Sequence, residues 1–303
     1  MKILVIGSDG TIGRALVRYL RKTTFDVLAL DNKSINYIDV TRRETFPDHA
    51  DFIVNPDLNS PDLVFHLAGR VGRVWCEIDK NDTLESNIIG TMNVIDYCNK
   101  IGARLVYAGT SESYEFPGAG PAEQRLMDPV HEDQKFPTKF NGVYGIAKSV
   151  AELLIKQYSD DAVILRYFMC YGNEIPRSGF RSFICESIAR ALKGEEIYVH
   201  QASSRSWCYI DDIIDGSYFA AVNGVQGEMY NIGSNEEIPT IMLAHKIVEL
   251  TDSDSDVISV DQPGNVYAHK RGDFGKMKEL GWEATTSLNA GLLRTIDFME
   301  KLK

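Results

Sequence analysis

The stretch KILVIGSDGTIGRALVRYL, from Lys2 to Leu20, decides the fold. Its apolar beginning predicts a buried strand, and the amphipathic pattern after Ile12 predicts a helix. Between them, Gly7, Gly10 and Gly13 follow the spacing GxxGxxG. Glycines there allow a tight turn, close approach of the backbone to a diphosphate and close helix packing, with the helix N-terminus facing the anion. A glycine-rich turn without a ligand is the alternative, which the flanking strand and helix disfavour.

An acidic residue follows the next predicted strand. Asp31 ends the run DVLALD and is followed by Asn32, with no arginine immediately beside the pair. A carboxylate at this place accepts hydrogen bonds from the adenosine ribose hydroxyls and repels a ribose 2′-phosphate. The sequence therefore predicts NAD as the cofactor in preference to NADP.

Apolar runs and helical patterns alternate along the first half of the chain. The runs cover 26–31, 63–69, 104–110 and 162–168, and the helical patterns cover 12–22, 87–100 and 144–158. This alternation is typical of a doubly wound parallel sheet with helices on both faces. We predict a Rossmann-type domain over 1–170 and a smaller lobe over 171–303, with part of 206–225 packing back on the first domain.

Composition excludes several classes of partner. The chain has 303 residues, a formal net charge of -11, five cysteines without a CxxC motif and six histidines. The negative charge argues against nucleic acid or an anionic membrane as the main partner. No apolar run approaches the roughly 20 residues of a membrane span, and the N-terminus begins with a strand. These features predict a cytoplasmic protein with reduced thiols and no metal site.

The stretch NGVYGIAKSV, 141–150, places Tyr144 and Lys148 four residues apart. On a helix this spacing puts both side chains on one face. A nearby ammonium favours the phenolate form of tyrosine, which suits general acid/base catalysis. Two solvated surface residues are the alternative. The dinucleotide turn and the strand end YAGTSESY, 107–114, favour the catalytic interpretation.

Many ordered motifs carry a resemblance to a known family. They are GSDGTIG, HLAG, NIIGTMNVIDYC, YAGTSESY, YGIAK, LRYFMCYG, SRSWCYIDDIIDG, YNIGS and KELGW. The chain resembles the extended short-chain dehydrogenase/reductase family, the NAD-dependent epimerases and dehydratases of nucleotide sugars, including the decarboxylase-like members. The resemblance implies an α/β fold, a Rossmann-type doubly wound parallel sheet with a smaller mixed α/β C-terminal substrate lobe. It also implies an enzyme that modifies a nucleotide-diphosphate sugar through a transient 4-keto intermediate, and a homodimer formed through the helices at 87–100 and 147–158.

The resemblance also assigns roles to single residues. Tyr144 is implied as the catalytic acid or base, and Lys148 as the residue that holds the nicotinamide ribose and lowers the pKa of the tyrosine. Thr110 adds a third hydroxyl, and Glu112 moves a proton beside the ketone, with a loop-orienting role as its alternative. The implied cofactor contacts are Gly7, Gly10, Thr11, Ile12, Gly13, Asp31, Asn32, Asp39, Val40, Leu67, Ala68, Gly69, Tyr144, Lys148 and Phe168.

On the substrate side the resemblance implies Ser111, Met169, Arg177, Arg205 and Arg271. Arg205 and Arg271 match positions expected to touch the phosphates, for which a guanidinium is suited. A solvated surface position is the alternative for Arg177. Met169 replaces an asparagine that is frequent in the family, and the 115–141 segment has no familiar pattern, so we expect an unusual sugar.

The outcome of the reaction stays open at this point. The Thr-Ser-Glu run at 110–112 is similar to that of nucleotide-sugar decarboxylases and GDP-mannose dehydratases. The residues between Tyr144 and Lys148 lack the charges usual in the decarboxylases. Epimerisation, dehydration and decarboxylation are all compatible with the motifs. An NADH-dependent keto-sugar reductase is a second enzyme interpretation, and a non-catalytic dinucleotide sensor is a third, which the set Thr110, Tyr144 and Lys148 disfavours.

Overall fold

The computed structural model describes residues 1–32, 40–41, 60–114, 129–134, 137, 140, 142–173, 182–200, 203–261 and 269–302. The chain divides into two compact units. Unit 1 comprises Met1–Ser113, Pro137–Arg166 and Ile214–Tyr230, and unit 2 comprises Tyr114–Phe136, Tyr167–Ile213 and Asn231–Lys303.

Unit 1 is built on a six-stranded sheet with the strand order β10-β5-β4-β3-β1-β2. The strands are β1 (Lys2–Ile6), β2 (Asp26–Leu30), β3 (Leu63–His66), β4 (Arg104–Thr110), β5 (Ala162–Tyr167) and β10 (Met229–Ile232). The β1, β2, β3 and β4 pairings are parallel. Because every residue of β3 and β5 is buried, these strands need the continuous apolar runs seen in the sequence.

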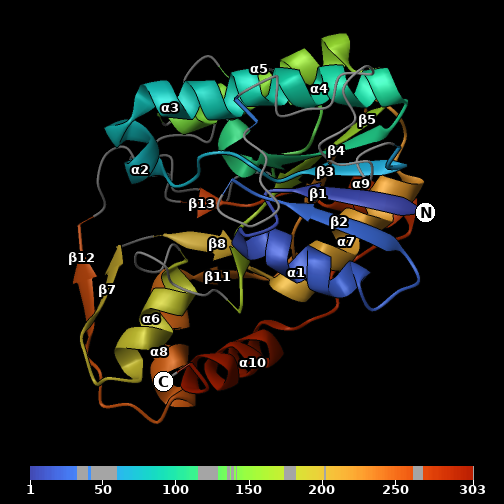
Figure 1. Cartoon of the computed structure of the whole chain (residues 1–303). Helices are drawn as coiled ribbons and strands as arrows, with labels where there is room; N and C mark the ends of the chain where they lie inside the picture. The colour runs from blue at the N-terminus through green and yellow to red at the C-terminus, as the bar shows by residue number, and fades with distance from the viewer. Residues whose placement is uncertain are drawn as a thin grey trace. The chain divides into compact units, whose positions relative to one another are not determined.

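Helices cover both faces of this sheet (Figure 1). Helices α3 (Lys80–Leu84), α4 (Gly90–Ile101) and α5 (Val143–Tyr158) lie on one face. Helix α1 (Thr11–Leu20) and the part of α7 (Ile210–Asn223) that belongs to unit 1 lie on the other. The hydroxyl of Tyr19 on α1 donates to Asp215 on α7 at 3.1 Å. The predicted doubly wound Rossmann-type sheet is therefore confirmed.

Short helices join β3 to α4. Helix α2 (Arg73–Ile78) precedes α3, and a π-helix, η3 (Glu85–Ile89), connects α3 to α4. The sequence pattern predicted a single helix over 87–100. A π-helix is rare and is frequently found at functional sites, because the extra residue per turn changes the direction of the side chains.

Unit 2 is a smaller mixture of helices and short strands, as predicted. A three-stranded sheet has the order β11-β8-β13, and two-stranded sheets join β12 to β7 and β6 to β9. The strands are β6 (Cys170–Tyr171), β7 (Ile197–His200), β8 (Ser204–Ser206), β9 (Cys208–Tyr209), β11 (Glu237–Pro239), β12 (Val257–Val260) and β13 (His269–Lys270). The helices are α6 (Phe183–Ala191), α8 (Thr240–Leu250), α9 (Gly275–Leu280) and α10 (Leu288–Glu300). Within the described ranges, no helix combines the length and apolar character needed to cross a membrane.

Candidate active site

The predicted site residues of unit 1 gather at the carboxyl ends of the parallel strands. Gly7 follows β1, Leu67 follows β3, and Thr110 ends β4. The chain leaves β1 for β2 on one side and returns to β3 on the other, so the strand order reverses at β1. In open α/β sheets, ligands bind outside the carboxyl ends of the strands at such a point.

The glycine turn is shaped by close backbone contacts. Gly7 has a φ of +89°, and a Cβ added to it would lie 2.4 Å from the amide nitrogen of Ala68. A Cβ on Gly13 would lie 2.1 Å from the carbonyl oxygen of Gly7. Gly10 is the N-cap of α1 and provides no side-chain hydrogen bond to the helix amides, so these donors suit an anion. Thr11 and Ile12 form the first turn of α1.

The acidic residue expected at the adenosine ribose lies beside this turn. Asp31 is buried, and its Oδ2 accepts a hydrogen bond from the backbone N–H of Asp9 at 3.0 Å. Asn32 is exposed. The glycine turn and the adjoining carboxylate together fit a dinucleotide with a free ribose 2′-hydroxyl.

Other predicted cofactor contacts lie at the neighbouring strand ends. Leu67 donates its backbone N–H to Ile6 at 2.8 Å, which fixes the chain leading to Ala68 and Gly69. Val40 packs against α4, where a Cβ on Gly90 would lie 2.6 Å from the Val40 Cγ2. Asp39 and Arg177, both predicted contacts, lie outside the described residues.

Thr110, Glu112 and Tyr144 meet where β4 ends. The Thr110 hydroxyl forms a hydrogen bond with the phenol of Tyr144, the second residue of α5. The same hydroxyl accepts the backbone N–H of Glu112 at 3.2 Å. The Thr110 hydroxyl therefore contacts both the Glu112 backbone and the Tyr144 phenol. The short helix η4 (Ser111–Ser113) thereby sets the orientation of the threonine that contacts the phenol.

The environment of Tyr144 favours the neutral phenol. Burial raises the pKa of Tyr144 above its ordinary value, and the Thr110 hydrogen bond acts in the opposite direction. The charge of Glu112 raises this pKa further. The resemblance implied a pKa lowered by Lys148, whereas burial is the largest influence on this pKa and raises it. A phenolate at this position therefore requires an additional positive charge.

Lys148 lies one turn further along the same face of α5. Its Nζ donates to the carbonyl oxygen of Ala108 at 2.9 Å and lies 4.7 Å from the ring centroid of Tyr107. The side chain is buried, and burial lowers the pKa of Lys148 to about 8. A Cβ added to Gly69 would lie 3.8 Å from the same Nζ, so the ammonium adjoins the strand end that was predicted to contact the cofactor.

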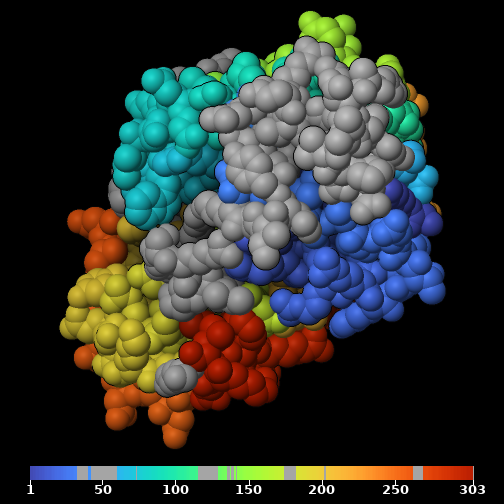
Figure 2. Space-filling model, viewed as in Figure 1, coloured from blue at the N-terminus to red at the C-terminus, as the bar shows by residue number. Residues whose placement is uncertain are grey.

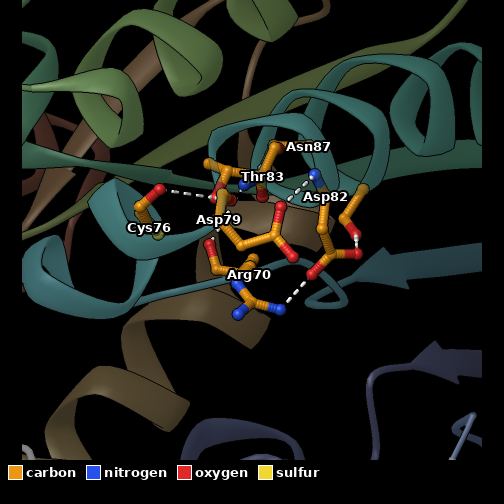
Figure 3. Close-up of polar contacts among 7 residues, drawn as sticks. Arg70, Cys76, Asp79, Asp82, Thr83 and Asn87 are labelled. Atoms are coloured by element: carbon orange, nitrogen blue, oxygen red, sulfur yellow. Dashed lines mark hydrogen bonds and ion pairs between the residues drawn. The ribbon is translucent and has the colours of Figure 1, made fainter.

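Asn87 fixes the loop that follows β3, and it was not among the predicted site residues. Its Nδ2 donates to the carbonyl oxygens of Arg70 and Thr83, both at 3.0 Å, as Figure 3 shows. A Cβ on Gly69 would lie 2.3 Å from the Asn87 Oδ1. Asn87 occupies the middle of the π-helix, and Arg70 is paired with Asp82 on α3. This network holds the Gly69 backbone beside Lys148.

Unit 2 presents two buried cations on one sheet face. Lys270 on β13 is the register partner of Arg205 on β8, so the two side chains leave the same face of the parallel pair. Their neighbours His269 and Ser204 share the other face, with the Ser204 Oγ 2.6 Å from the His269 Nδ1. Arg205 and Lys270 are buried, whereas Arg271 is exposed. The residue beside Arg205 is therefore Lys270, and Arg271, the other predicted phosphate contact, is its exposed neighbour in sequence.

The remaining predicted contacts are backbone-anchored or buried. Phe168 is 2% exposed and packs with Tyr114 and Phe274 in the core of unit 2. The carbonyl oxygen of Met169 accepts the backbone N–H of Cys208 at 3.0 Å. Ser111 is buried in η4.

Comparisons with known proteins agree with this geometry. UDP-glucuronic acid decarboxylase 6 of Arabidopsis thaliana is 29% identical over 317 residues, covering 100% of this chain and 90% of the relative. The solved UDP-glucose 4-epimerase of Thermotoga maritima, with UDP-glucose, has a TM-score of 0.85 at 24% identity and covers 100% and 99% of the two chains. The structure of MoeE5 in complex with UDP-glucuronic acid and NAD has a TM-score of 0.83 at 22% identity, with 100% coverage of both.

A family model matches residues 3–233 and is described as the NAD dependent epimerase/dehydratase family. The match spans the glycine turn, the strand ends, and the helix with Tyr144 and Lys148, and it reaches into unit 2 beyond Arg205. The chain belongs to the NAD dependent epimerase/dehydratase family, and it is an enzyme that uses NAD as its cofactor.

Proposed function

We propose that the enzyme oxidises and then decarboxylates a nucleotide-diphosphate hexuronate, with UDP as the nucleotide. The observation that carries the proposal is the contact between the Thr110 hydroxyl and the Tyr144 phenol, with Glu112 on the adjoining turn. The oxidation step is common to the epimerases, dehydratases and decarboxylases of this family. The decarboxylase assignment is supported by the relative that acts on UDP-glucuronic acid, which aligns along the whole chain.

The residues of the cluster divide the chemistry between them. Tyr144 takes the proton of the sugar hydroxyl on carbon 4, and Thr110 donates a hydrogen bond to the phenolate or to the sugar oxygen. Lys148 holds the nicotinamide ribose and supplies positive charge on the same helix face. Bound NAD would supply a reversible hydride acceptor for carbon 4 and the positive charge of its oxidised ring.

A ketone on carbon 4 activates the carboxylate of a hexuronate. The carboxylate is attached to carbon 5, so the oxidised sugar is a β-keto acid. The bond between carbon 5 and the carboxylate breaks, carbon dioxide leaves, and the electron pair moves into an enolate. A proton is then added at carbon 5. Glu112 is half-buried and lies in η4, two residues after Thr110. We assign this proton transfer to its carboxyl group.

The diphosphate requires cations, which the acidic chain supplies locally. Arg205 and Lys270 are buried on one face of the three-stranded sheet of unit 2. A guanidinium and an ammonium on one sheet face can both donate hydrogen bonds to the oxygens of a diphosphate. We assign the diphosphate to these two residues, with unit 1 as the cofactor-binding domain and unit 2 as the substrate-binding lobe.

We also propose a cytoplasmic homodimer. Leu84, Ile89, Ile146 and Leu153 are exposed apolar residues on α3, η3 and α5. Helices α2 and α3 lie at the surface of unit 1, cyan at the upper left of Figure 2. Exposed apolar residues gathered on adjacent helices are typical of a protein interface. All five cysteines are free thiols, which suits a reducing compartment.

The test is incubation with UDP-glucuronic acid and a panel of UDP-, GDP-, dTDP- and CDP-sugars, followed by mass spectrometry. The proposal expects loss of carbon dioxide from a UDP-hexuronate with NAD needed only in trace amounts. Loss of water, or a change of configuration without a change of mass, would replace decarboxylation by dehydration or epimerisation. Stoichiometric consumption of NADH would indicate a reductase.

A further inference from the structure

Behind the catalytic residues lies a buried ion pair to which no role has been assigned. Glu152 on α5 and Arg166 on β5 are joined by a contact of 2.5 Å between Oε2 and Nη2, and the Arg166 Nε lies 3.1 and 3.2 Å from the two carboxylate oxygens. The side chains are 8% exposed for Arg166 and 4% exposed for Glu152. A pair this buried is costly to desolvate, so stability alone is a weak reason for it.

The carboxylate of Glu152 also holds the turn that carries the catalytic residues. Its Oε1 accepts the hydroxyl proton of Ser113 at 3.1 Å, at the end of η4. A Cβ on Gly109 would lie 2.9 Å from the same oxygen, so only glycine leaves room for the carboxylate there. Gly109 directly precedes Thr110, and Ser113 directly follows Glu112. Glu152 therefore contacts β4 and η4 on both sides of Thr110 and Glu112.

The same carboxylate adjoins Lys148 through the helix. Glu152 is four residues after Lys148 and eight after Tyr144, so the three side chains form one line along α5. Burial lowers the pKa of Lys148, and the charge of Glu152 acts in the opposite direction. Burial, followed by the charge of Lys148, lowers the pKa of His66 on β3 to about 3, so that imidazole is neutral. Among the described residues, Tyr107 on β4 and Cys76 on α2 are further titratable groups near Lys148, and Tyr144 lies one turn before it on α5.

We infer that Glu152, held by Arg166, is a positioning residue that keeps Lys148 charged and locks the Thr110–Glu112 turn against the catalytic helix. The inference rests on the proposed function, in which the Lys148 ammonium is required. By this inference, the buried Glu152–Arg166 pair sets the electrostatic environment of Lys148. The Glu152 carboxylate is bound by Arg166 and lies one helical turn after Lys148 on α5.

The experiment compares Glu152→Gln/Arg166→Gln with a second ion pair of unit 1. Removing both charges avoids an uncompensated buried ion, which a single substitution would leave. The control is Arg104→Gln/Asp161→Asn, because Arg104 begins β4, Asp161 immediately precedes β5, and their side chains meet at 3.0 Å. Glu152→Asp tests rescue by a shorter carboxylate. Stability is measured by thermal unfolding, and activity by the pH profile of kcat/KM. The titration of Lys148 is followed by NMR of ¹³Cε-labelled lysine. The Lys148 signal is identified by its absence in Lys148→Met.

The inference expects the Glu152→Gln/Arg166→Gln protein to titrate Lys148 about 1 pH unit lower, with the alkaline limb of kcat/KM moved by the same amount. The control pair and Glu152→Asp leave the Lys148 titration where it is. An unchanged Lys148 titration in the folded double variant would overturn the inference, whatever happens to the melting temperature. The NMR titration does not depend on turnover. Retained activity in Tyr144→Phe would therefore refute the proposed function without deciding the role of Glu152.

Discussion

At the scale of single residues, the hydroxyl of Thr110 links two parts of the reaction. It accepts the Glu112 backbone N–H at 3.2 Å and forms a hydrogen bond with the Tyr144 phenol. A donor aimed at the phenol oxygen stabilises the phenolate, and the oxidation step requires a base at that oxygen. The turn that carries Glu112 therefore also orients the partner of Tyr144.

Replacing Tyr144 by phenylalanine removes the base without changing the size of the side chain. We expect NAD binding to remain and kcat to fall by about 10²- to 10⁴-fold, the usual contribution of general acid/base catalysis. NAD binding is measured by calorimetry, and turnover by mass spectrometry of the nucleotide sugar. Tyr158→Phe is the matched control, because Tyr158 is the exposed last residue of the same helix. A Tyr144→Phe enzyme as active as Tyr158→Phe would contradict the assignment.

Lys148 gives activity and stability opposite dependences on pH. Its pKa is lowered to about 8 in the folded protein from an ordinary value of 10.5. Activity requires the ammonium, so kcat/KM should decline above about pH 8. The unfolded chain binds more protons than the folded chain between those two values, so the contribution of Lys148 to the free energy of unfolding should rise with pH across that window.

The size of that rise is on the order of 1 to 3 kcal/mol, since one pKa unit corresponds to 1.36 kcal/mol. Urea unfolding at several pH values measures it as the difference between the natural protein and Lys148→Met. Lys156→Met is the control, because Lys156 is exposed on the same helix. Equal pH dependence of the free energy of unfolding in all three proteins would show that folding does not lower the pKa of Lys148.

The proposed function places the action of Glu112 after the oxidation. In Glu112→Gln we expect the bound NAD to be reduced when the sugar is added, because Tyr144 and Lys148 remain in place. Product formation should fall by about 10²-fold or more, since the amide cannot deliver the proton to carbon 5. Absorbance of NADH in a single turnover separates the two steps, and solvent deuterium in the product follows the proton transfer. Normal deuterium incorporation would leave Glu112 with the loop-orienting role only.

At the scale of elements, helix α5 carries Tyr144 and Lys148, and a residue of helix α2 binds the N-terminus of α5. Glu77 on α2 accepts the backbone N–H of Val143, the first residue of α5, at 2.6 Å. This hydrogen bond lowers the pKa of Glu77. A carboxylate at a helix N-terminus satisfies an otherwise unpaired amide and opposes the helix dipole. The residue that follows Val143 is Tyr144, so the cap fixes the turn that presents the phenol.

Glu77→Ala should lower the free energy of unfolding by about 1 kcal/mol, the usual value of a lost helix cap. It should also lower kcat more than it raises KM, because the cap positions a catalytic group. The stabilising contribution is present above the ordinary carboxyl pKa and is lost as the pH falls through the lowered value in the folded protein. The control is Glu85→Ala at the exposed start of η3. Equal effects on stability and on kcat in the two variants would show that Glu77 does not position Tyr144.

Local spacing predicted the parts of the site that depend on one element. Gly7 and Gly13 were predicted because three glycines between a strand and a helix are a local pattern, and Tyr144 and Lys148 because four residues make one helical turn. Lys270 was missed because the register of β13 against β8 decides which side chain faces Arg205. Glu152 was missed for a similar reason, since its partner Arg166 belongs to a different element. The π-helix at Asn87 has no periodicity that distinguishes it from the helices around it.

At the scale of the whole molecule, charge and apolar surface are distributed unevenly. The chain has a formal net charge of -11, yet the cations assigned to the substrate, Arg205 and Lys270, are buried together in unit 2. Such local pairing allows an acidic protein to bind a diphosphate while its surface repels nucleic acid. The exposed apolar residues follow a different pattern, since Ile146 and Leu153 lie about two helical turns apart on α5 and therefore share one face.

The proposed homodimer depends on that apolar surface. Ile146 and Leu153 are 42% and 49% exposed, and a lysine at position 153 would place a charge inside an interface formed by α5. Burying an unpaired charge in an interface is strongly unfavourable, so Leu153→Lys should shift the protein from dimer to monomer. Light scattering coupled to size-exclusion chromatography measures the mass against the 34.0 kDa of one chain. Leu293→Lys on α10, at 47% exposure, is the control and should leave the mass unchanged. Circular dichroism checks that both variants are folded, since a folded Leu153→Lys protein that keeps the dimer mass would exclude α5 from the interface.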